Sequence, residues 1–339
     1  MPPLDPEAAP EEIVPGCVRI TLPDPFVPGV TAVFLIGDPS APVLLDAGAG
    51  TDACEAALRA RLAGLGHAVA DLPMILSHTH LDHAGGLLRA TPRELTVHAR
   101  ADAEMRDEEP RSSRGPIALR RMGVDEATIA ELAPSGEPVE GAPLAVVRVD
   151  RRLEGPAGEA PGAPGWRWLL AEGHAPGHLM LFDTATRTLL AADQFLQKWK
   201  TPLIVSDPEF DSFGAYVESI EGARRLEPER ICSSHTETIE DARGWLADMQ
   251  ASLERRLARV TEAVRGADPG AAGGAGAADG RNSDAGLSAD DVLSALYPTA
   301  SRGPLRIVFL REILAMLRHL AFGGRLTRET VDGVERFSP

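Results

Sequence analysis

The run Ser77-His78-Thr79-His80-Leu81-Asp82-His83-Ala84-Gly85-Gly86 places three histidines and one aspartate within six residues. It continues the apolar segment 72–77, which predicts a buried strand leading directly into the cluster. Imidazoles and a carboxylate crowded this closely would desolvate one another, whereas a divalent cation would satisfy all of them. The run therefore predicts a metal site at the end of a strand.

The spacing within the run indicates two metal positions rather than one. His78 and His80 lie two residues apart, so on extended backbone their side chains share a face. After a turn, Asp82 and His83 can reach a second position a short distance away. The glycine pair that ends the run lets the following helix approach closely, because glycine has no Cβ.

Strands and helices are predicted on both sides of this run. Upstream, short β-like segments punctuated by proline and glycine predict an antiparallel meander, followed by a helix. The upstream segments are 17–22, 30–36 and 43–46 for the strands and 51–64 for the helix. Downstream, strands are predicted over 95–98, 144–150, 166–172, 178–183, 188–192 and 231–233, and helices within 101–134 and over 211–226. Strands followed by helices, twice over, predict a four-layer αββα sandwich.

The C-terminal part of the chain predicts a separate, mainly helical region. A helix over 242–265 precedes a Gly/Ala/Asp/Ser-rich stretch, 266–286, which is typical of a flexible linker. Two helices, 288–296 and 303–322, then lead to a hairpin around Asp332-Gly333, a winged-helix-like order. We therefore expect a catalytic domain over residues 1–240 and a C-terminal region over 241–339.

The composition of the chain limits its expected binding partners and its expected cellular location. The net charge of −16 argues against nucleic acid, because affinity for a polyanion comes chiefly from clustered lysine and arginine. The chain has no apolar run long enough for a membrane span, and its first residues lack a secretory signal, so we expect a cytoplasmic protein. The three widely spaced cysteines predict small buried residues rather than disulfides. We expect a small-molecule substrate; a homo-oligomer stays open.

Three later landmarks make the chain resemble a known family. Gly173-His174-Ala175-Pro176-Gly177-His178 matches a GHxPGH segment, Ala192-Asp193 matches a strand-end aspartate, and His235 matches a final histidine. With the HxHxDH run, they resemble the metallo-β-lactamase superfamily over about residues 15–240, within its glyoxalase-II-like or lactamase-beta-like branch. The resemblance implies one metal on His78, His80 and His174, a second on Asp82, His83 and His235, and Asp193 shared between them.

The resemblance also implies supporting residues around the metal ligands. Asp46, in Leu45-Asp46-Ala47-Gly48, corresponds to an aspartate of the family that supports a ligand, and we expect His178 to support the site by hydrogen bonding. The chain departs from the family around His235, where Ser-Ser-His-Thr replaces the usual Pro-Gly-His-Gly. This departure leaves the geometry of that loop open.

A two-metal site predicts hydrolysis. Two cations can lower the pKa of a bridging water and present hydroxide to a carbonyl or phosphoryl group, while Asp193 or Asp82 moves the proton to the leaving group. Zinc is the expected metal, with iron or manganese also compatible with mixed His and carboxylate ligation. In true β-lactamases the resemblance would imply a different residue at the position of Asp193, so it argues against that activity and favours an ester, thioester or lactone of a small molecule as the substrate. Alternatives are a phosphodiesterase or endoribonuclease-like hydrolase, a single-iron sulfur dioxygenase and a non-catalytic binding protein.

Lys198 and Lys200 are the two lysines of a chain that otherwise uses arginine. They follow Asp193 closely, and on an extended segment their ammonium groups would share a face. This placement predicts binding of an anionic substrate tail; two solvated surface lysines are the alternative.

Overall fold

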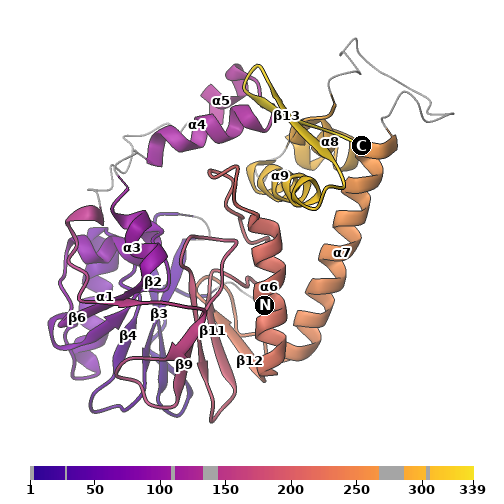
Figure 1. Ribbon diagram of the computed structural model, residues 1–339. Coiled ribbons are helices and arrows are strands. Elements are labelled where there is room, and N and C mark those ends of the chain that lie inside the picture. Colours follow the sequence, from indigo (N-terminus) through magenta and orange to yellow (C-terminus); the bar gives the residue numbers. More distant parts are fainter. Residues whose placement is uncertain (1–3, 27–28, 108–110, 133–143, 267–285, 303–305) are drawn as a thin grey trace. The chain divides into compact units, whose positions relative to one another are not determined.

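The computed structural model describes residues 4–26, 29–107, 111–132, 144–266, 286–302 and 306–339, which Figure 1 draws as ribbon. The described chain divides into two compact units. Unit 1 comprises Met1–Glu108, Val139–Thr201 and Glu218–Leu246, and unit 2 comprises Glu109–Pro138, Pro202–Val217 and Ala247–Pro339. Unit 2 thus takes two segments from before residue 240. The predicted linker 266–286, apart from its two end residues, lies outside the described residues.

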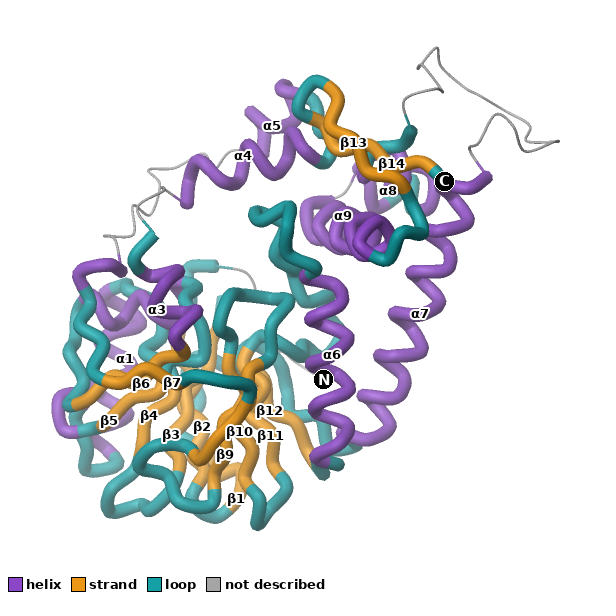
Figure 2. The backbone as a smooth tube through the Cα atoms, viewed as in Figure 1, coloured by secondary structure: helices purple, strands orange, loops and turns teal. Residues whose placement is uncertain are grey.

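Unit 1 contains two sheets (Figure 2). One is seven-stranded in the order β1 to β7, and the other is five-stranded in the order β12-β11-β10-β9-β8. The first sheet consists of β1 (Glu11–Val14), β2 (Cys17–Pro23), β3 (Val30–Ile36), β4 (Val43–Leu45), β5 (Pro73–Ile75), β6 (Glu94–His98) and β7 (Arg151–Leu153). The second consists of β8 (Ala157–Glu159), β9 (Trp166–Leu170), β10 (Leu179–Asp183), β11 (Thr188–Ala192) and β12 (Arg230–Ser233). β1 to β4 form the predicted antiparallel meander.

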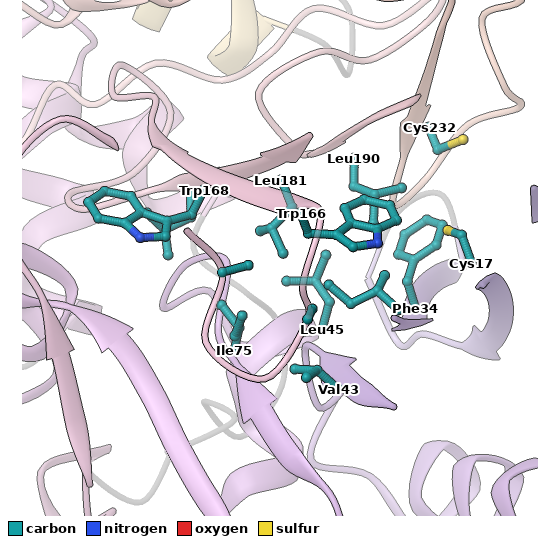
Figure 3. Packing of buried hydrophobic residues seen from close by; sticks show 14 of the residues in the cluster. Cys17, Phe34, Val43, Leu45, Ile75, Trp166, Trp168, Leu181, Leu190 and Cys232 are labelled. Carbon is teal, nitrogen blue, oxygen red and sulfur yellow. The ribbon is translucent and has the colours of Figure 1, made fainter. Parts of the chain in front are cut away.

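Side-chain alternation along β3 explains how the first sheet is buried on both faces. Phe34 and its neighbours at even positions join a cluster that includes Trp166, Trp168 and Leu181 of the second sheet (Figure 3). Val33 and Leu35 join a different cluster with residues of α1 (Asp52–Gly64). Because successive side chains of a strand point to opposite faces, one all-apolar strand supplies both cores.

Helices complete the layers of unit 1. α1 covers the outer face of the first sheet, with Cys54, Leu58 and Leu62 buried. α6 (Ser212–Leu226) runs alongside β11 and β12, and its residues Ile220 and Ala223 are fully buried. Helix, sheet, sheet and helix form the predicted four-layer αββα sandwich. Shorter helices follow the strands in α2 (Leu81–Ala84), α3 (Ala99–Met105) and the 3-10 turns η1 (Val69–Asp71) and η2 (Gly85–Leu88).

The predicted strand over 144–150 is wrong. The segment begins with a 3-10 turn, η3 (Leu144–Val146), and strand pairing starts only at Arg151. The Asp150 side chain accepts a hydrogen bond from the Leu95 N–H, which replaces the next rung of the strand ladder. Strands β1 and β8 were not predicted, because their exposed residues show no apolar alternation. The three cysteines are buried thiols, as predicted.

Unit 2 contains helices and one hairpin. Its elements are α4 (Arg111–Arg121), α5 (Glu126–Leu132), α8 (Ala289–Leu296), η5 (Ala300–Arg302), α9 (Arg306–Phe322), β13 (Thr327–Val331) and β14 (Val334–Ser338), together with most of α7 (Ala242–Gly266). Asp332 and Gly333 both have positive φ, the conformation of a two-residue hairpin turn. The predicted order of helix, helix and hairpin is confirmed. Among the described residues, no helix combines the length and apolarity that crossing a membrane requires.

A buried ion pair ties the hairpin of unit 2 to α9. Arg318 Nε donates to Glu335 Oε2 at 3.0 Å, and both side chains are almost fully buried. The same guanidinium donates to the carbonyl oxygens of Val205 and Asp207 at 3.0 and 3.2 Å. One arginine thus holds α9, β14 and the segment after residue 202 together.

Glu335→Gln should destabilise the protein strongly, because it leaves the Arg318 charge buried without a counter-charge. We expect a loss of about 3 kcal/mol in the free energy of unfolding of the protein, measured by urea denaturation. Glu209→Gln is the matched control, since Glu209 pairs with Arg328 in an exposed position where a salt bridge contributes roughly 0–1 kcal/mol. Equal losses in the free energy of unfolding of the two variants would contradict a stabilising role for the buried Arg318–Glu335 ion pair.

Candidate metal centre

The ends of parallel strands bring the polar residues of unit 1 together. β4 and β5 are parallel, so Asp46, directly after β4, lies beside Ser77, which donates its backbone N–H to the Asp46 carboxylate at 2.6 Å. In the second sheet β11 and β12 are also parallel, and they are followed directly by Asp193 and closely by His235. Both sheets therefore present carboxylates and imidazoles at strand ends.

Two clusters of metal-binding side chains result. The histidine cluster consists of His78, His80 and His174, and the mixed cluster consists of Asp82, His83, Asp193 and His235. In each cluster the candidate ligand atoms lie within 4.8 Å of one another. His80 is the N-cap residue of the short helix α2, whose single turn carries Asp82 and His83. Neighbouring residues of the chain therefore contribute to both clusters.

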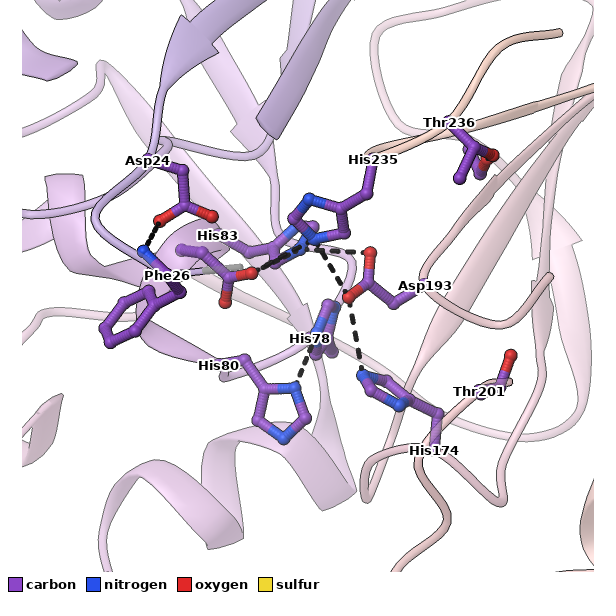
Figure 4. A network of polar contacts seen from close by, with 12 residues as sticks. Asp24, Phe26, His78, His80, His83, His174, Asp193, Thr201, His235 and Thr236 are labelled. Carbon is purple, nitrogen blue, oxygen red and sulfur yellow. Dashed lines mark hydrogen bonds and ion pairs between the residues drawn. The ribbon is translucent and has the colours of Figure 1, made fainter. Parts of the chain in front are cut away.

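Asp193 belongs to the mixed cluster and also approaches the histidine cluster (Figure 4). Its Oδ2 is 3.2 Å from His235 Nε2 and 3.7 Å from His174 Nε2. Its Oδ1 is 3.2 Å from His83 Nε2. One carboxylate therefore approaches histidines of both clusters.

The contacts within the clusters fit a cation better than hydrogen bonds. His83 Nε2 and Asp193 Oδ1 are buried and only 3.2 Å apart, yet neither makes a hydrogen bond within the described residues. His78 Nε2 and His80 Nδ1 lie 3.1 Å apart, close to the roughly 3.3 Å expected for two nitrogens on one tetrahedral zinc with Zn–N bonds of 2.0–2.1 Å. The donor atoms converge as ligands of a metal ion do.

The remaining ring nitrogens are held by outer contacts that orient the imidazoles. His83 Nδ1 lies 2.8 Å from Asp46 Oδ2, and His235 Nδ1 lies 2.6 Å from the carbonyl oxygen of Val30. His78 Nδ1 lies 3.0 Å from Ser77 Oγ. In all three residues Nε2 is left facing its cluster, the arrangement by which supporting groups fix metal-binding histidines.

Electrostatics separate the two clusters. Burial and the neighbouring histidines hold the pKa of His78 well below its usual range, which keeps its ring neutral and its lone pair available. Burial alone would lower the pKa of His235, but Asp193 and Asp82 outweigh it and raise that pKa to about 10. Burial likewise opposes ionisation of Asp82, whereas His83 and His235 bring its pKa down to about 2. The mixed cluster therefore favours positive charge at its centre.

Comparison with known proteins agrees with this geometry. A family model described as the metallo-beta-lactamase superfamily matches residues 27–235. The chain belongs to this superfamily. The probable metallo-hydrolase YqjP of Bacillus subtilis is 28% identical over 269 residues, which is 73% of this chain and 79% of that protein. The probable metallo-hydrolase YflN of the same organism is 26% identical over 238 residues, or 61% of this chain and 80% of that protein.

Solved structures show the same fold along almost the whole chain. The metallo-beta-lactamase family protein TTHA1429 from Thermus thermophilus aligns with a TM-score of 0.69 and 22% identity, covering 96% of this chain and 99% of that one. A beta-lactamase domain protein from Burkholderia ambifaria gives 0.67 and 21%, covering 97% and 94%. On the family model and the two relatives named as probable metallo-hydrolases, the chain is a metal-dependent hydrolase of the superfamily, and its described residues include two clusters that could hold metal ions.

The loop that departs from the family at its last histidine is held by side-chain hydroxyls. Thr236 Oγ1 lies 2.5 Å from Ser233 Oγ and accepts a hydrogen bond from the Gln197 N–H at 3.2 Å. These contacts join the loop after β12 to the loop after Asp193. The Ser-Ser-His-Thr sequence therefore still places His235 in the mixed cluster.

Two sequence-based expectations about neighbouring residues differ from the structure. His178 is fully buried, with its ring 4.8 Å from that of His78, but neither of its nitrogens hydrogen-bonds a described residue. It contacts the site by ring packing instead of the expected hydrogen bond. Residues 198–200 are not extended: they belong to a turn in which Lys198 has a φ of 66°. The argument that Lys198 and Lys200 share a face on an extended segment is therefore wrong.

One residue near the site was not identified from the sequence. Asp24 follows β2 and is buried, and its charge interacts with those of Asp82, His235 and His83. Burial, and secondarily the Asp82 charge, raise the pKa of Asp24 above its usual value. No spacing links its Pro-Asp-Pro segment to the histidine run, so no local signal could have identified it.

Asp82→Ala should weaken binding at the mixed cluster much more than at the histidine cluster, because Asp82 belongs only to the former. Zinc titration of the metal-free variant, followed by elemental analysis, should show one tight ion retained and the affinity for a second reduced at least about tenfold. Asp52→Ala, which removes an exposed aspartate, is the control. Equal weakening of both ions by Asp82→Ala would disprove the division into two clusters.

Proposed function

We propose that the protein is a dinuclear hydrolase that cleaves an ester, thioester or lactone of a small molecule. The position of Asp193 carries the proposal, because its two oxygens approach His83, His235 and His174 from two adjoining clusters. Divalent cations, with zinc as the expected metal, would activate water at neutral pH and polarise the substrate oxygen when bound there. Histidine and carboxylate ligands suit zinc and also iron or manganese.

The two carboxylates of the mixed cluster would have different roles in the reaction. Asp193, joined to both clusters, would hold the two halves of the site in register. Asp82 is the most exposed carboxylate of the mixed cluster, with 16% of its side chain accessible. A substrate can reach Asp82 more readily than Asp193, so we assign Asp82 the transfer of a proton to the leaving group and Asp193 a supporting role in that transfer.

A substrate screen tests the proposal and its alternatives together. Metal-loaded protein would be assayed with thioesters, lactones, simple esters, β-lactams and phosphodiesters, and oxygen consumption would be recorded with a thiol persulfide. Hydrolysis of a carbonyl substrate with two bound metal ions supports the proposal. Turnover of phosphodiesters alone, or oxygen uptake with one bound iron, would replace it with the nuclease-like or dioxygenase alternative.

Asp193→Ala should abolish nearly all turnover while the fold is retained. The loss in kcat should exceed the ~10-fold expected for a residue that merely supports a ligand. Circular dichroism checks the fold, and Asp183→Ala controls for the loss of a buried carboxylate, since Asp183 holds a turn away from the clusters. A variant that keeps more than a tenth of the wild-type kcat would show that Asp193 does not bridge.

The two lysines are a second element of the proposal. Lys198 is exposed and Lys200 half-buried in the turn that follows Asp193, on either side of the exposed Trp199. We propose that they attract an anionic tail of the substrate, which the acidic surface of this chain would otherwise repel.

Lys198→Ala and Lys200→Ala should raise KM for an anionic substrate by up to about fivefold, the effect of a partly exposed ion pair, with kcat little changed. The rise should be larger at low salt, because salt screens exposed charges. Steady-state kinetics on a matched neutral substrate provide the control. Equal effects on both substrates, or none, would leave the lysines as surface residues.

A further inference from the structure

Asp24, which is not one of the candidate metal ligands, has a buried carboxylate oxygen that accepts no hydrogen bond from the described residues. Its Oδ1 accepts a hydrogen bond from the Phe26 N–H at 3.1 Å, which is an ordinary loop contact. Its Oδ2 is buried, and within the described residues no donor reaches it. Only 8% of the residue is exposed to solvent. A carboxylate oxygen in such a position costs free energy unless a positive charge compensates it.

The loop that carries Asp24 is fastened to the mixed cluster. The Asp24 N–H donates to the carbonyl oxygen of Gly29 at 3.1 Å, which closes the loop at the start of β3. The next residue, Val30, accepts the hydrogen bond from His235 Nδ1. Asp24 therefore occupies the border of the mixed cluster, as Figure 4 shows, where its charge interacts with Asp82 and His83.

Asp24 is not placed as a metal ligand. The ligand atoms that lie within 4.8 Å of one another come from Asp82, His83, Asp193 and His235, and Asp24 does not belong to this set. Within the described part of the chain, it also makes no hydrogen bond to any of these four side chains. Any effect of Asp24 on the mixed cluster is therefore a through-space electrostatic effect of its charge.

Counting charges shows what Asp24 adds. Two divalent cations would bring four positive charges into a site whose ligands are mostly buried. Asp82 and Asp193 supply two negative charges among the ligands, and Asp46, hydrogen-bonded to His83, supplies a third. The Asp24 carboxylate adds a further negative charge at the border of the mixed cluster, before any bound hydroxide is counted.

We propose that Asp24 neutralises the mixed cluster electrostatically and thereby raises the affinity for the cation held there. This inference rests on the proposed two-metal site. The histidine cluster, whose ligands are neutral imidazoles and which Asp24 does not border, is affected less.

Asp24→Asn tests the proposal, because asparagine keeps the shape and an oxygen for the Phe26 N–H but removes the charge. Metal-free protein at pH 8 would be titrated with zinc by calorimetry and by competition with a chromophoric chelator. We expect one of the two ions to bind as in the wild type and the other, held by the mixed cluster, to bind at least about tenfold more weakly. Asp24→Ser, which also keeps an acceptor without charge, should reproduce the loss.

Asp38→Asn is the matched control. Asp38 makes the same kind of loop contact, accepting the Ser40 N–H at 2.8 Å, but it is exposed and outside both clusters. Circular dichroism and the unfolding temperature of each metal-free variant show whether the fold is kept.

The possible results separate this inference from the proposed function. Wild-type protein that binds two ions, with unchanged affinities in both Asp24 variants, would overturn the role of Asp24 and leave the two-metal site intact. Equal weakening of both ions would also overturn it. Wild-type protein that binds a single ion would overturn both proposals.

Discussion

The need for positive charge among buried carboxylates governs this structure. Asp193 is almost fully shielded from water and Asp82 largely so, and ionised carboxylates in such surroundings are costly without compensation. The protein supplies that compensation through His83 and His235, whose pKa values the same carboxylates raise. A divalent cation supplies it more completely, because it also satisfies the imidazole nitrogens. The site is therefore matched to cations before any substrate is considered.

The two sheets make this concentration of polar groups possible. Their facing surfaces form an apolar cluster that runs from Cys17 through Trp166 to Cys232, and the polar residues lie beyond the strand ends. Close backbone contact is needed there: a Cβ on Gly86 would lie 2.2 Å from the carbonyl oxygen of Ala47. The glycine pair that the sequence identified thus lets the loop after β4 meet the loop after β5, which places Asp46 against His83.

The features that could be predicted from the sequence are those set by the spacing of residues close together in the chain. The HxHxDH run divides between two clusters because it includes both the loop that follows β5 and the single turn of α2. The apolar run 30–36 predicted the strand that became β3. Contacts between distant segments could not be predicted. The Val30 carbonyl that orients His235 is 205 residues away from it in the sequence. Because every residue has a backbone carbonyl, the identity of residue 30 does not reveal this contact. Asp24 was missed for the same reason, and Lys198 was misjudged because its left-handed backbone has no signal in its sequence.

Backbone conformation shows where the fold is strained in assembling the site. Asp46 and Ala192 have positive φ values of 68° and 43°, which are uncommon for residues with a Cβ and cost about 1–2 kcal/mol each. Asp46 orients His83, and Ala192 directly precedes Asp193, so both strained residues position the mixed cluster. The hydrogen bonds of Asp46 to Ser77 and His83 hold one of them in place. Because strain of this kind persists only where surrounding contacts over-determine it, the contacts around these two residues hold the candidate metal ligands of the mixed cluster in position.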